Sequence, residues 1–223
     1  MKANVIKLNP RFLGFSNWCY IVECMDSSSS VVIDASWNLD MFVRIFEERK
    51  IIPKSLFLTH SHFDHISLVN KFIERYNVRI YMSADEIEHY KFKSPNLYGL
   101  DNNQIICVDN MNVKCFLTPG HTKGSMCFQI DDNLFTGDTV FYEGCGMCNT
   151  LGGSALDMYH SIQFIKEFFP QDTKIYSGHT YCRSVGAMLK EIMRDNIYFN
   201  IDNANDFINF RMRPLQKKLF DFI

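Results

Sequence analysis

The stretch Thr59-His60-Ser61-His62-Phe63-Asp64-His65 places four side chains that can bind a metal within six positions. It follows the apolar run 55–58, and a short run of this kind that ends in a turn is typical of a buried strand. Residues 66–76 then have the pattern of a helix. The cluster therefore lies where a strand ends and a helix begins, which is where α/β sheets place their chemistry.

Neutral imidazoles and ionised carboxylates are ligands that zinc and its neighbours among the transition metals accept. His60 and His62 are two residues apart and can point into one site, whereas Asp64 and His65 can turn toward a second. A polar loop rich in histidine by chance is the alternative. Three of the chain's seven histidines fall here beside an aspartate, which favours a metal site.

Three more potential ligands follow strand-like runs later in the chain, each directly after a glycine. They are Gly120-His121, Gly137-Asp138 and Gly178-His179. A glycine allows the tight turn that presents the next side chain at the end of a strand. Each pair alone is common, but together with the first cluster they predict one composite metal site.

The remaining pattern predicts alternating strands and helices. Strands are expected at residues 4–8, 19–23, 31–34, 78–81, 104–108, 113–117, 125–130, 134–136 and 173–176. Helices are expected at residues 39–50, 66–76, 83–89, 154–168 and 185–196. Ser83 with Glu86 and Ser154 with Asp157 have the spacing of helix N-terminal caps. The order of elements suggests two sheets face to face with helices outside.

Composition limits the classes of function. Hydrophobic residues make up 47% and charged residues 22% of the 223 residues, as in ordinary globular proteins. A net charge of −2 gives no reason to expect nucleic acid as a partner. Apolar runs are shorter than the ~20 residues of a membrane span, and the N-terminus lacks the apolar segment of a secretory signal. We therefore expect a cytoplasmic protein without membrane partners, with residues 1–223 forming one domain and 197–223 a short C-terminal extension.

This set of residues resembles the metallo-β-lactamase superfamily, in particular its glyoxalase II-like branch, over about residues 5–195. The resemblance implies an α/β fold, namely an αββα sandwich of two mixed β-sheets flanked by helices, with a two-metal site between the sheets. It implies that the first metal is held by His60, His62 and His121. It implies that the second is held by Asp64, His65 and His179, with Asp138 bridging. Asp34 would orient a ligand, although Ser36 stands where the family has a glycine.

The resemblance implies hydrolysis with two zinc ions, although the same ligands also accept iron or manganese. Two adjacent cations lower the pKa of a shared water, and the resulting metal-bound hydroxide attacks an acyl carbonyl. Asp64 and Asp138 would be the catalytic carboxylates. A thiolate leaves without a strong acid because its parent thiol has a pKa of roughly 8.5, so a thioester is the expected substrate.

Further motifs resemble the zinc-dependent acyl hydrolases encoded with trans-acyltransferase polyketide synthases. These motifs are residues 141–148, 151–154, 196–200 and 207–213. That group removes acyl units from acyl carrier proteins. Two alternatives stay open, a glyoxalase II-like hydrolase of small thioesters such as glutathione thioesters, and a mononuclear iron persulfide dioxygenase. Glyoxalase II holds glutathione with a long C-terminal helical extension, and only about thirty residues follow the last predicted core helix here.

Two features outside the ligand set have several interpretations. Cys145 and Cys148 could be a structural zinc pair, a redox pair or, as we expect, part of a loop that walls the substrate channel. The basic residues of the tail are either solvated or a docking surface for an acidic carrier protein, and they are Arg211, Arg213, Lys217 and Lys218. His89 and His160 are expected at the surface.

Overall fold

The computed structural model describes residues 3–25 and 27–214, which form two six-stranded sheets and a two-stranded ribbon. The first sheet has the order β1 (Asn4–Leu8), β4 (Cys19–Glu23), β5 (Ser29–Ile33), β6 (Ile52–Phe57), β7 (Arg79–Ser83) and β8 (Leu97–Leu100). The second has the order β14 (Ala187–Met188), β13 (Lys174–Ser177), β12 (Asn133–Gly137), β11 (Met126–Ile130), β10 (Met111–Leu117) and β9 (Ile105–Val108). The ribbon pairs β2 (Arg11–Phe12) with β3 (Phe15–Ser16).

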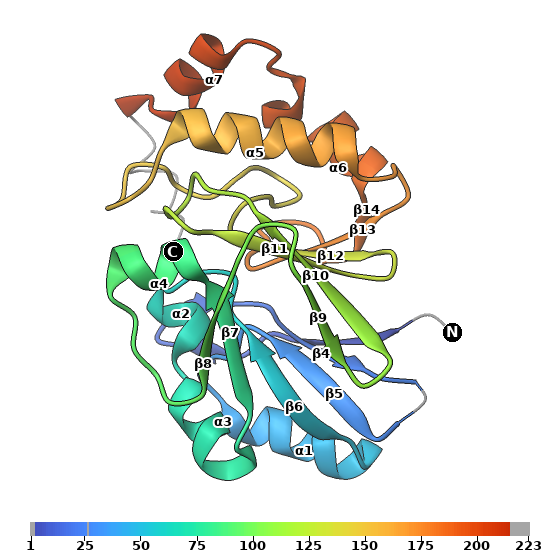
Figure 1. The fold of residues 1–223 in the computed structure, drawn as a ribbon. Coiled ribbons are helices and arrows are strands. Elements are labelled where there is room, and N and C mark those ends of the chain that lie inside the picture. Colours follow the sequence, from blue (N-terminus) through green and yellow to red (C-terminus); the bar gives the residue numbers. More distant parts are fainter. Residues whose placement is uncertain (1–2, 26, 215–223) are drawn as a thin grey trace.

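Both sheets contain parallel and antiparallel pairs, so both are mixed, as predicted. The helices on the first sheet's side are α1 (Leu39–Arg49), α2 (Phe63–Ile66) and α3 (Val69–Tyr76). The helical elements on the second sheet's side are α5 (Ala155–Phe168), α6 (Leu189–Asp195), the 3₁₀ turn η1 (Ile197–Asn200) and α7 (Ala204–Arg211). Figure 1 shows these groups on opposite outer sides, with α4 (Ala84–Tyr90) at one end of the sandwich. The predicted αββα sandwich is confirmed.

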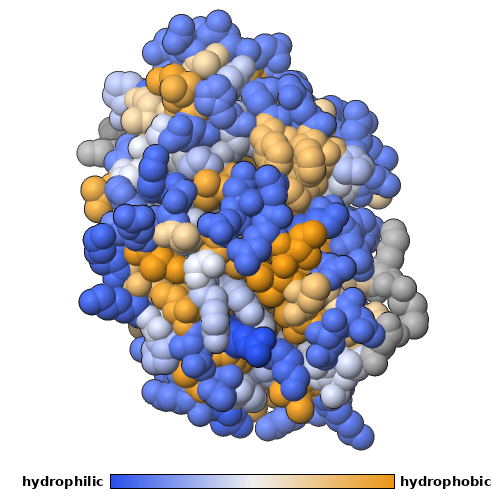
Figure 2. All heavy atoms as spheres, in the orientation of Figure 1, coloured by the Kyte–Doolittle hydropathy of each residue, from blue (hydrophilic) through white to orange (hydrophobic). Residues whose placement is uncertain are grey.

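Successive side chains of β4 point to opposite faces of the sheet, so this strand contributes to two apolar clusters. Tyr20 and Val22 pack between the two sheets, whereas Cys19 and Ile21 face the layer of α1 and α3. All five residues of this strand are buried, because both faces of the sheet are covered. Figure 2 shows that hydrophilic residues cover most of the visible surface, with hydrophobic residues gathered in patches across its middle.

The helix predicted at residues 66–76 is interrupted, and this part of the prediction was wrong. Leu68 separates α2 from α3, and its backbone N–H donates to the carbonyl of Ala35. The carbonyl that a continuous helix would use, that of Asp64, instead accepts from the side chain of Asn17. Tertiary partners have therefore replaced the helical hydrogen bond at this position.

The helix predicted at residues 185–196 begins later, at Leu189. Ala187 and Met188 pair with β13 as a short edge strand, and the N–H of Gly186 donates to Ile175. Gly186 has a φ of +94°, a conformation that favours glycine and lies outside the α-helical region, so the helix cannot include this residue. The short edge strand β8 was not predicted, because Tyr98 and Gly99 are exposed and carry no hydrophobic alternation.

Residues 197–211 pack against α5, and Figure 1 shows α7 on the side of α5 that faces away from the sheets. Tyr198, Phe199 and Phe207 belong to the same apolar cluster as the buried residues of α5. Within the described ranges, no helix is both long enough and apolar enough to cross a membrane.

Candidate metal centre

All seven predicted ligands lie just beyond the ends of strands, five on loops and two, Asp64 and His65, in the short helix α2. The loop after β6 leads into His60, and His121, Asp138 and His179 follow β10, β12 and β13. Gly178 has to be a glycine because a Cβ there would lie 2.4 Å from Asp138 Oδ1 and 2.7 Å from His65 Cε1. The absence of a side chain at this position therefore allows the last loop to approach the first cluster.

Three imidazoles form the first group. His62 Nδ1 lies 3.1 Å from His60 Nε2 and 2.9 Å from His121 Nε2. Burial lowers the pKa of His60 well below its usual range and lowers the pKa of His121 to about 4. The neutral rings of His60 and His121 converge with that of His62, and the ligand atoms of the three fall within 4.8 Å of one another, an arrangement suited to hold a cation.

Asp64, His65 and His179 form the second group. Asp64 Oδ2 lies 3.2 Å from His179 Nε2 and 3.7 Å from His65 Nε2. Burial opposes a charge on His179, but the neighbouring carboxylate of Asp138 outweighs it and raises the pKa of that imidazole to about 10. Positive charge is therefore favoured at this position. In the polypeptide alone that charge is a proton on the imidazole, and a bound cation would replace the proton.

Asp138 lies between the two groups. Its Oδ2 is 3.4 Å from His121 Nε2 and 3.5 Å from His179 Nε2, and its Oδ1 is 3.4 Å from His65 Nε2. Burial raises the pKa of this carboxyl, but the positive charges of His179 and His65 outweigh burial and hold it well below its usual range. A carboxylate that contacts both groups is placed to serve two cations at once.

Asp34 directs the rings of two histidines. Its Oδ2 accepts from His65 Nδ1 at 2.8 Å and from the hydroxyl of Thr59 at 2.8 Å. The Thr59 hydroxyl proton is used in that bond, so its oxygen accepts from His60 Nδ1 at 3.1 Å. Both histidines thereby keep their protons on Nδ1 and turn Nε2 toward the centre. The orienting role expected for Asp34 is consistent with this geometry despite Ser36.

Backbone carbonyls direct two further rings in the same way. His121 Nδ1 donates to the carbonyl of Met147 at 2.7 Å, and His179 Nδ1 donates to that of Ser16 at 2.9 Å. The Nε2 atoms of both rings therefore face the carboxylate of Asp138.

A direct test of fit comes from polar atoms that lack partners. His65 Nε2 and Asp138 Oδ1 are both fully buried and have no hydrogen-bond partner within the described residues. Buried polar atoms are nearly always satisfied, and an ion is one accepted reason for an exception. A ring nitrogen and a carboxylate oxygen 3.4 Å apart are a suitable donor pair for a cation such as zinc. The residues fit the metal that the resemblance implies.

Glu86 is a buried residue for which the sequence predicted only a role at a helix cap, not its contacts with the ligand loops. Ser83 caps α4 as predicted, accepting from the Glu86 N–H, but the Glu86 carboxylate does not return to the cap. It instead accepts from Ser61 and Thr122 on two ligand loops. Glu86 lies three residues after Ser83, which is the spacing of a capping box, and this spacing led to the prediction of a cap. The sequence alone does not show that Ser61 and Thr122 compete for the same carboxylate.

The interpretation of the tail needs correction at Arg211. This side chain is buried and donates to the carbonyl of Gly146 at 2.9 and 2.7 Å, so it is neither solvated nor available for docking. Arg213 is half-buried and lies over the ring of Phe210. Lys217 and Lys218 lie outside the described residues.

Cys145 and Cys148 are free thiols in the apolar cluster beneath α5. Burial raises the pKa of both, and that of Cys148 reaches about 11. Neither belongs to a group of described side chains that could hold a metal, which argues against the structural zinc pair. Their role in lining a substrate channel stays a prediction. His89 and His160 are exposed, as expected.

Comparisons with known proteins agree with the geometry. Residues 13–103 match the metallo-beta-lactamase superfamily. The probable polyketide biosynthesis zinc-dependent hydrolase PksB of Bacillus subtilis (strain 168) is 43% identical over 96% of both chains. A hydroxyacylglutathione hydrolase of Buchnera aphidicola subsp. Baizongia pistaciae is 31% identical over 83% of this chain and 73% of its own.

Among solved structures, a metallo-beta-lactamase from Staphylococcus aureus subsp. aureus COL superimposes with a TM-score of 0.85 at 26% identity, covering 96% of this chain and 68% of that one. Fold, ligand geometry and sequence similarity agree, and this chain belongs to the metallo-β-lactamase superfamily, in the same family as the polyketide-biosynthesis zinc-dependent hydrolases.

Proposed function

We propose that this protein is a dinuclear zinc hydrolase that cleaves thioesters, with acyl groups on an acyl carrier protein as its substrates in cytoplasmic polyketide biosynthesis. The observation that carries the proposal is the convergence of His60, His65 and Asp138 with two buried atoms that lack hydrogen-bond partners in the described chain. Similarity to named polyketide-biosynthesis hydrolases over 96% of the chain supports the substrate class.

The proposed ligands divide into two sets that share Asp138. One set is His60, His62 and His121, and the other is Asp64, His65 and His179. Zinc bound here would supply a Lewis acid and a water of lowered pKa. The protein's part is to hold the imidazoles in one tautomer, which Asp34 and two backbone carbonyls do.

Asp64 differs from Asp138 in its access to solvent. Its side chain is 26% exposed, against 9% for Asp138. Burial opposes ionisation of Asp64, but its hydrogen bond with His179 outweighs burial and holds the pKa low, so the carboxylate is ionised at neutral pH. We assign Asp64 the role of the catalytic carboxylate at the more exposed side of the centre, while Asp138 contacts both ligand groups.

A thioester suits this arrangement because the leaving thiolate needs no strong acid. Exposed aromatic residues beside the site offer contact to an apolar acyl chain. Phe63, between two ligands, is 67% exposed, and Trp37 contacts both Phe63 and Phe12 with ring centroids 5.4 and 5.2 Å apart. An acyl group that packs on these rings would bury apolar surface.

The test compares one acyl group on two thiols. We expect a higher kcat/KM for the carrier-bound acyl group than for the same acyl group on glutathione, and two zinc ions per chain by elemental analysis. His60→Ala and Asp138→Ala should lose metal and turnover together. His160→Ala, which changes an exposed histidine on α5, should keep both.

The similarity to a hydroxyacylglutathione hydrolase favours glutathione thioesters as the second candidate. Saturation by the glutathione thioester with no gain from a carrier protein would select that candidate. A single iron per chain with oxygen consumption would instead replace hydrolysis with the dioxygenase reaction.

A further inference from the structure

Glu86 lies in the first turn of α4, outside the proposed ligand set, and its side chain is completely buried. Its Oε1 accepts from the backbone N–H of Ser61 at 2.8 Å and from the Ser61 hydroxyl at 2.7 Å. Its Oε2 accepts from the Thr122 hydroxyl at 2.8 Å and from the backbone N–H of Gly124 at 2.9 Å. Four donors therefore converge on one carboxylate.

The two oxygens of Glu86 hold different loops. Ser61 lies between His60 and His62 on the loop after β6, in the first sheet. Thr122 follows His121 on the loop after β10, in the second sheet. The carboxylate thus joins the two loops whose imidazoles form the first group, and these loops belong to opposite sheets.

The approach of the second loop depends on Gly124. A Cβ at this position would lie 2.2 Å from the backbone nitrogen of Glu86 and 2.6 Å from its Cα. The loop therefore rests directly on the first turn of α4. Burying a carboxylate is unfavourable unless its oxygens are hydrogen-bonded. Both oxygens of Glu86 therefore have their hydrogen-bond partners only when the two loops are in place together.

Asp34 and Glu86 act on different parts of the centre. Asp34 reaches the rings of His65 and, through Thr59, His60. The carboxylate of Glu86 instead holds Ser61 and Thr122, the neighbours of His62 and His121, whose ring atoms Nδ1 and Nε2 lie 2.9 Å apart. Loss of Glu86 would therefore alter the spacing between the two loops while the bond between Asp34 and His65 is kept.

We infer that Glu86 is a positioning residue for the metal held by His60, His62 and His121, because it sets the distance between the two loops that carry them. The inference rests on the proposed ligand set. Partners that orient metal ligands typically change metal affinity by about 10- to 100-fold when removed. This loss falls on the first of the two ions, since the second group keeps its own supports.

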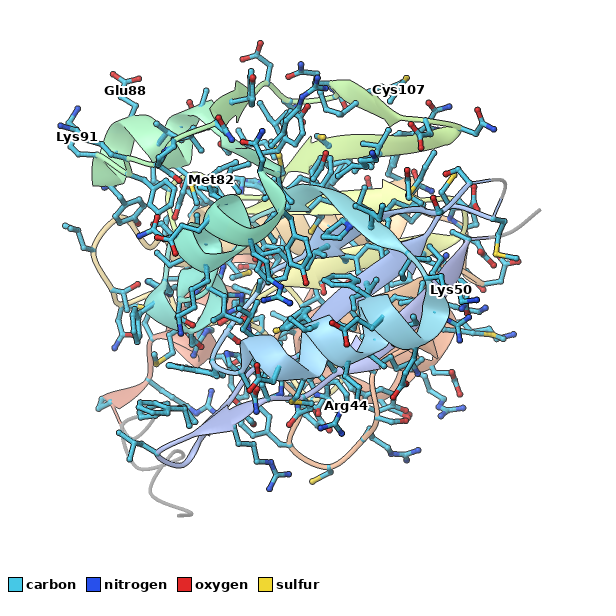
Figure 3. The ribbon with its side chains drawn as sticks, turned by 90° about the horizontal axis from the view of Figure 1, so that it is seen from below. Arg44, Lys50, Met82, Glu88, Lys91 and Cys107 are labelled. Carbon is cyan, nitrogen blue, oxygen red and sulfur yellow. The ribbon has the colours of Figure 1, made fainter. Side chains whose placement is uncertain are left out.

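The experiment measures zinc bound per chain against a graded series of a competing chelator, with full-length Glu86→Ala. We expect one of the two ions to bind about 10- to 100-fold more weakly and the other to bind as in the parent protein. Glu86→Gln keeps only one acceptor oxygen, so the backbone N–H of either Ser61 or Gly124 loses its partner, and the loss of zinc affinity should be intermediate. Glu88→Gln on the same helix is the matched control, because Glu88 is exposed and points away from the molecule (Figure 3).

A second variant distinguishes a loss of positioning from misfolding of the Glu86 variants. Ser61→Ala combined with Thr122→Ala removes two of the four donors and leaves the carboxylate in place. It should weaken the same ion, with the other unchanged. Unchanged affinity for both ions in either folded variant would overturn the inference, and so would an equal loss at both ions, which marks a general structural role.

His121→Ala separates this inference from the proposed function. If His121→Ala keeps both ions, the ligand set itself is wrong. If it loses one ion while the Glu86 variants lose none, only the role of Glu86 fails.

Discussion

The guanidinium of Arg211, in the last turn of α7, donates two hydrogen bonds to the carbonyl of Gly146. The next residue, Met147, accepts from the ring of His121, and the Gly146 N–H donates to the carbonyl of Asp138. One arginine of the C-terminal segment thereby fixes a loop that contacts two proposed ligands. This segment belongs structurally to the metal centre.

Arg211→Met should lower both stability and turnover. The substitution leaves the Gly146 carbonyl without its two donors, which costs about 1–3 kcal/mol of the free energy of unfolding. Urea denaturation and turnover on the same samples measure the two effects. Arg44→Ala, which changes an exposed residue of α1, should alter neither. Equal unfolding midpoints for Arg211→Met and the parent would contradict the bracing role.

Asp34→Asn should lower metal affinity by about 10- to 100-fold. An amide nitrogen at Oδ2 cannot accept from His65 Nδ1, so the ring loses the partner that sets its tautomer. Asp34 has a φ of +48°, a conformation that asparagine tolerates well, so backbone strain does not confuse the result. Chelator competition measures the loss. Parent-like zinc retention would show that His65 is oriented without this carboxylate.

Gly178→Ala should prevent metal binding at the bridging position. Its Cβ would lie 2.4 Å from Asp138 Oδ1, so either the carboxylate or the loop has to move. Gly99→Ala is the matched control, because its Cβ would meet Ala84 at an ordinary 3.4 Å. Elemental analysis of both proteins should show loss of zinc in the first alone; two ions in Gly178→Ala would disprove this close approach.

Thiol labelling at pH 8 should modify two cysteines quickly. Cys107 and Cys182 are exposed, and Figure 3 shows Cys107 at the edge of the sheet. The other six are buried and therefore shielded from the reagent. Burial also raises the pKa of Cys148 to about 11 and of Cys127 to about 12, so these two thiols are mostly protonated at pH 8. Counting released chromophore before and after denaturation distinguishes the groups, and rapid reaction of more than two would show that the apolar cluster opens.

Local pattern was sufficient for much of this protein. The helix of residues 39–49 begins after Asn38 as expected, because its capping side chain and apolar face are neighbours in sequence. The strand at residues 19–23 was also predicted correctly. Failures occurred where distant partners replaced local ones, as at Leu68, whose N–H binds Ala35, and at Ala187, which pairs with Ile175.

The sequence by itself determined the fold family and the residues that can bind metal, because histidine and aspartate after successive strands form a pattern that needs no distances. Only the tertiary structure decided which oxygens and nitrogens meet. Asp138 contacts both groups of ligands, Glu86 joins loops from opposite sheets, and Arg211 is buried rather than solvated. The reason is physical: a buried polar atom takes whichever partner the packed sheets bring within hydrogen-bond distance, and that partner is set by packing across the whole chain.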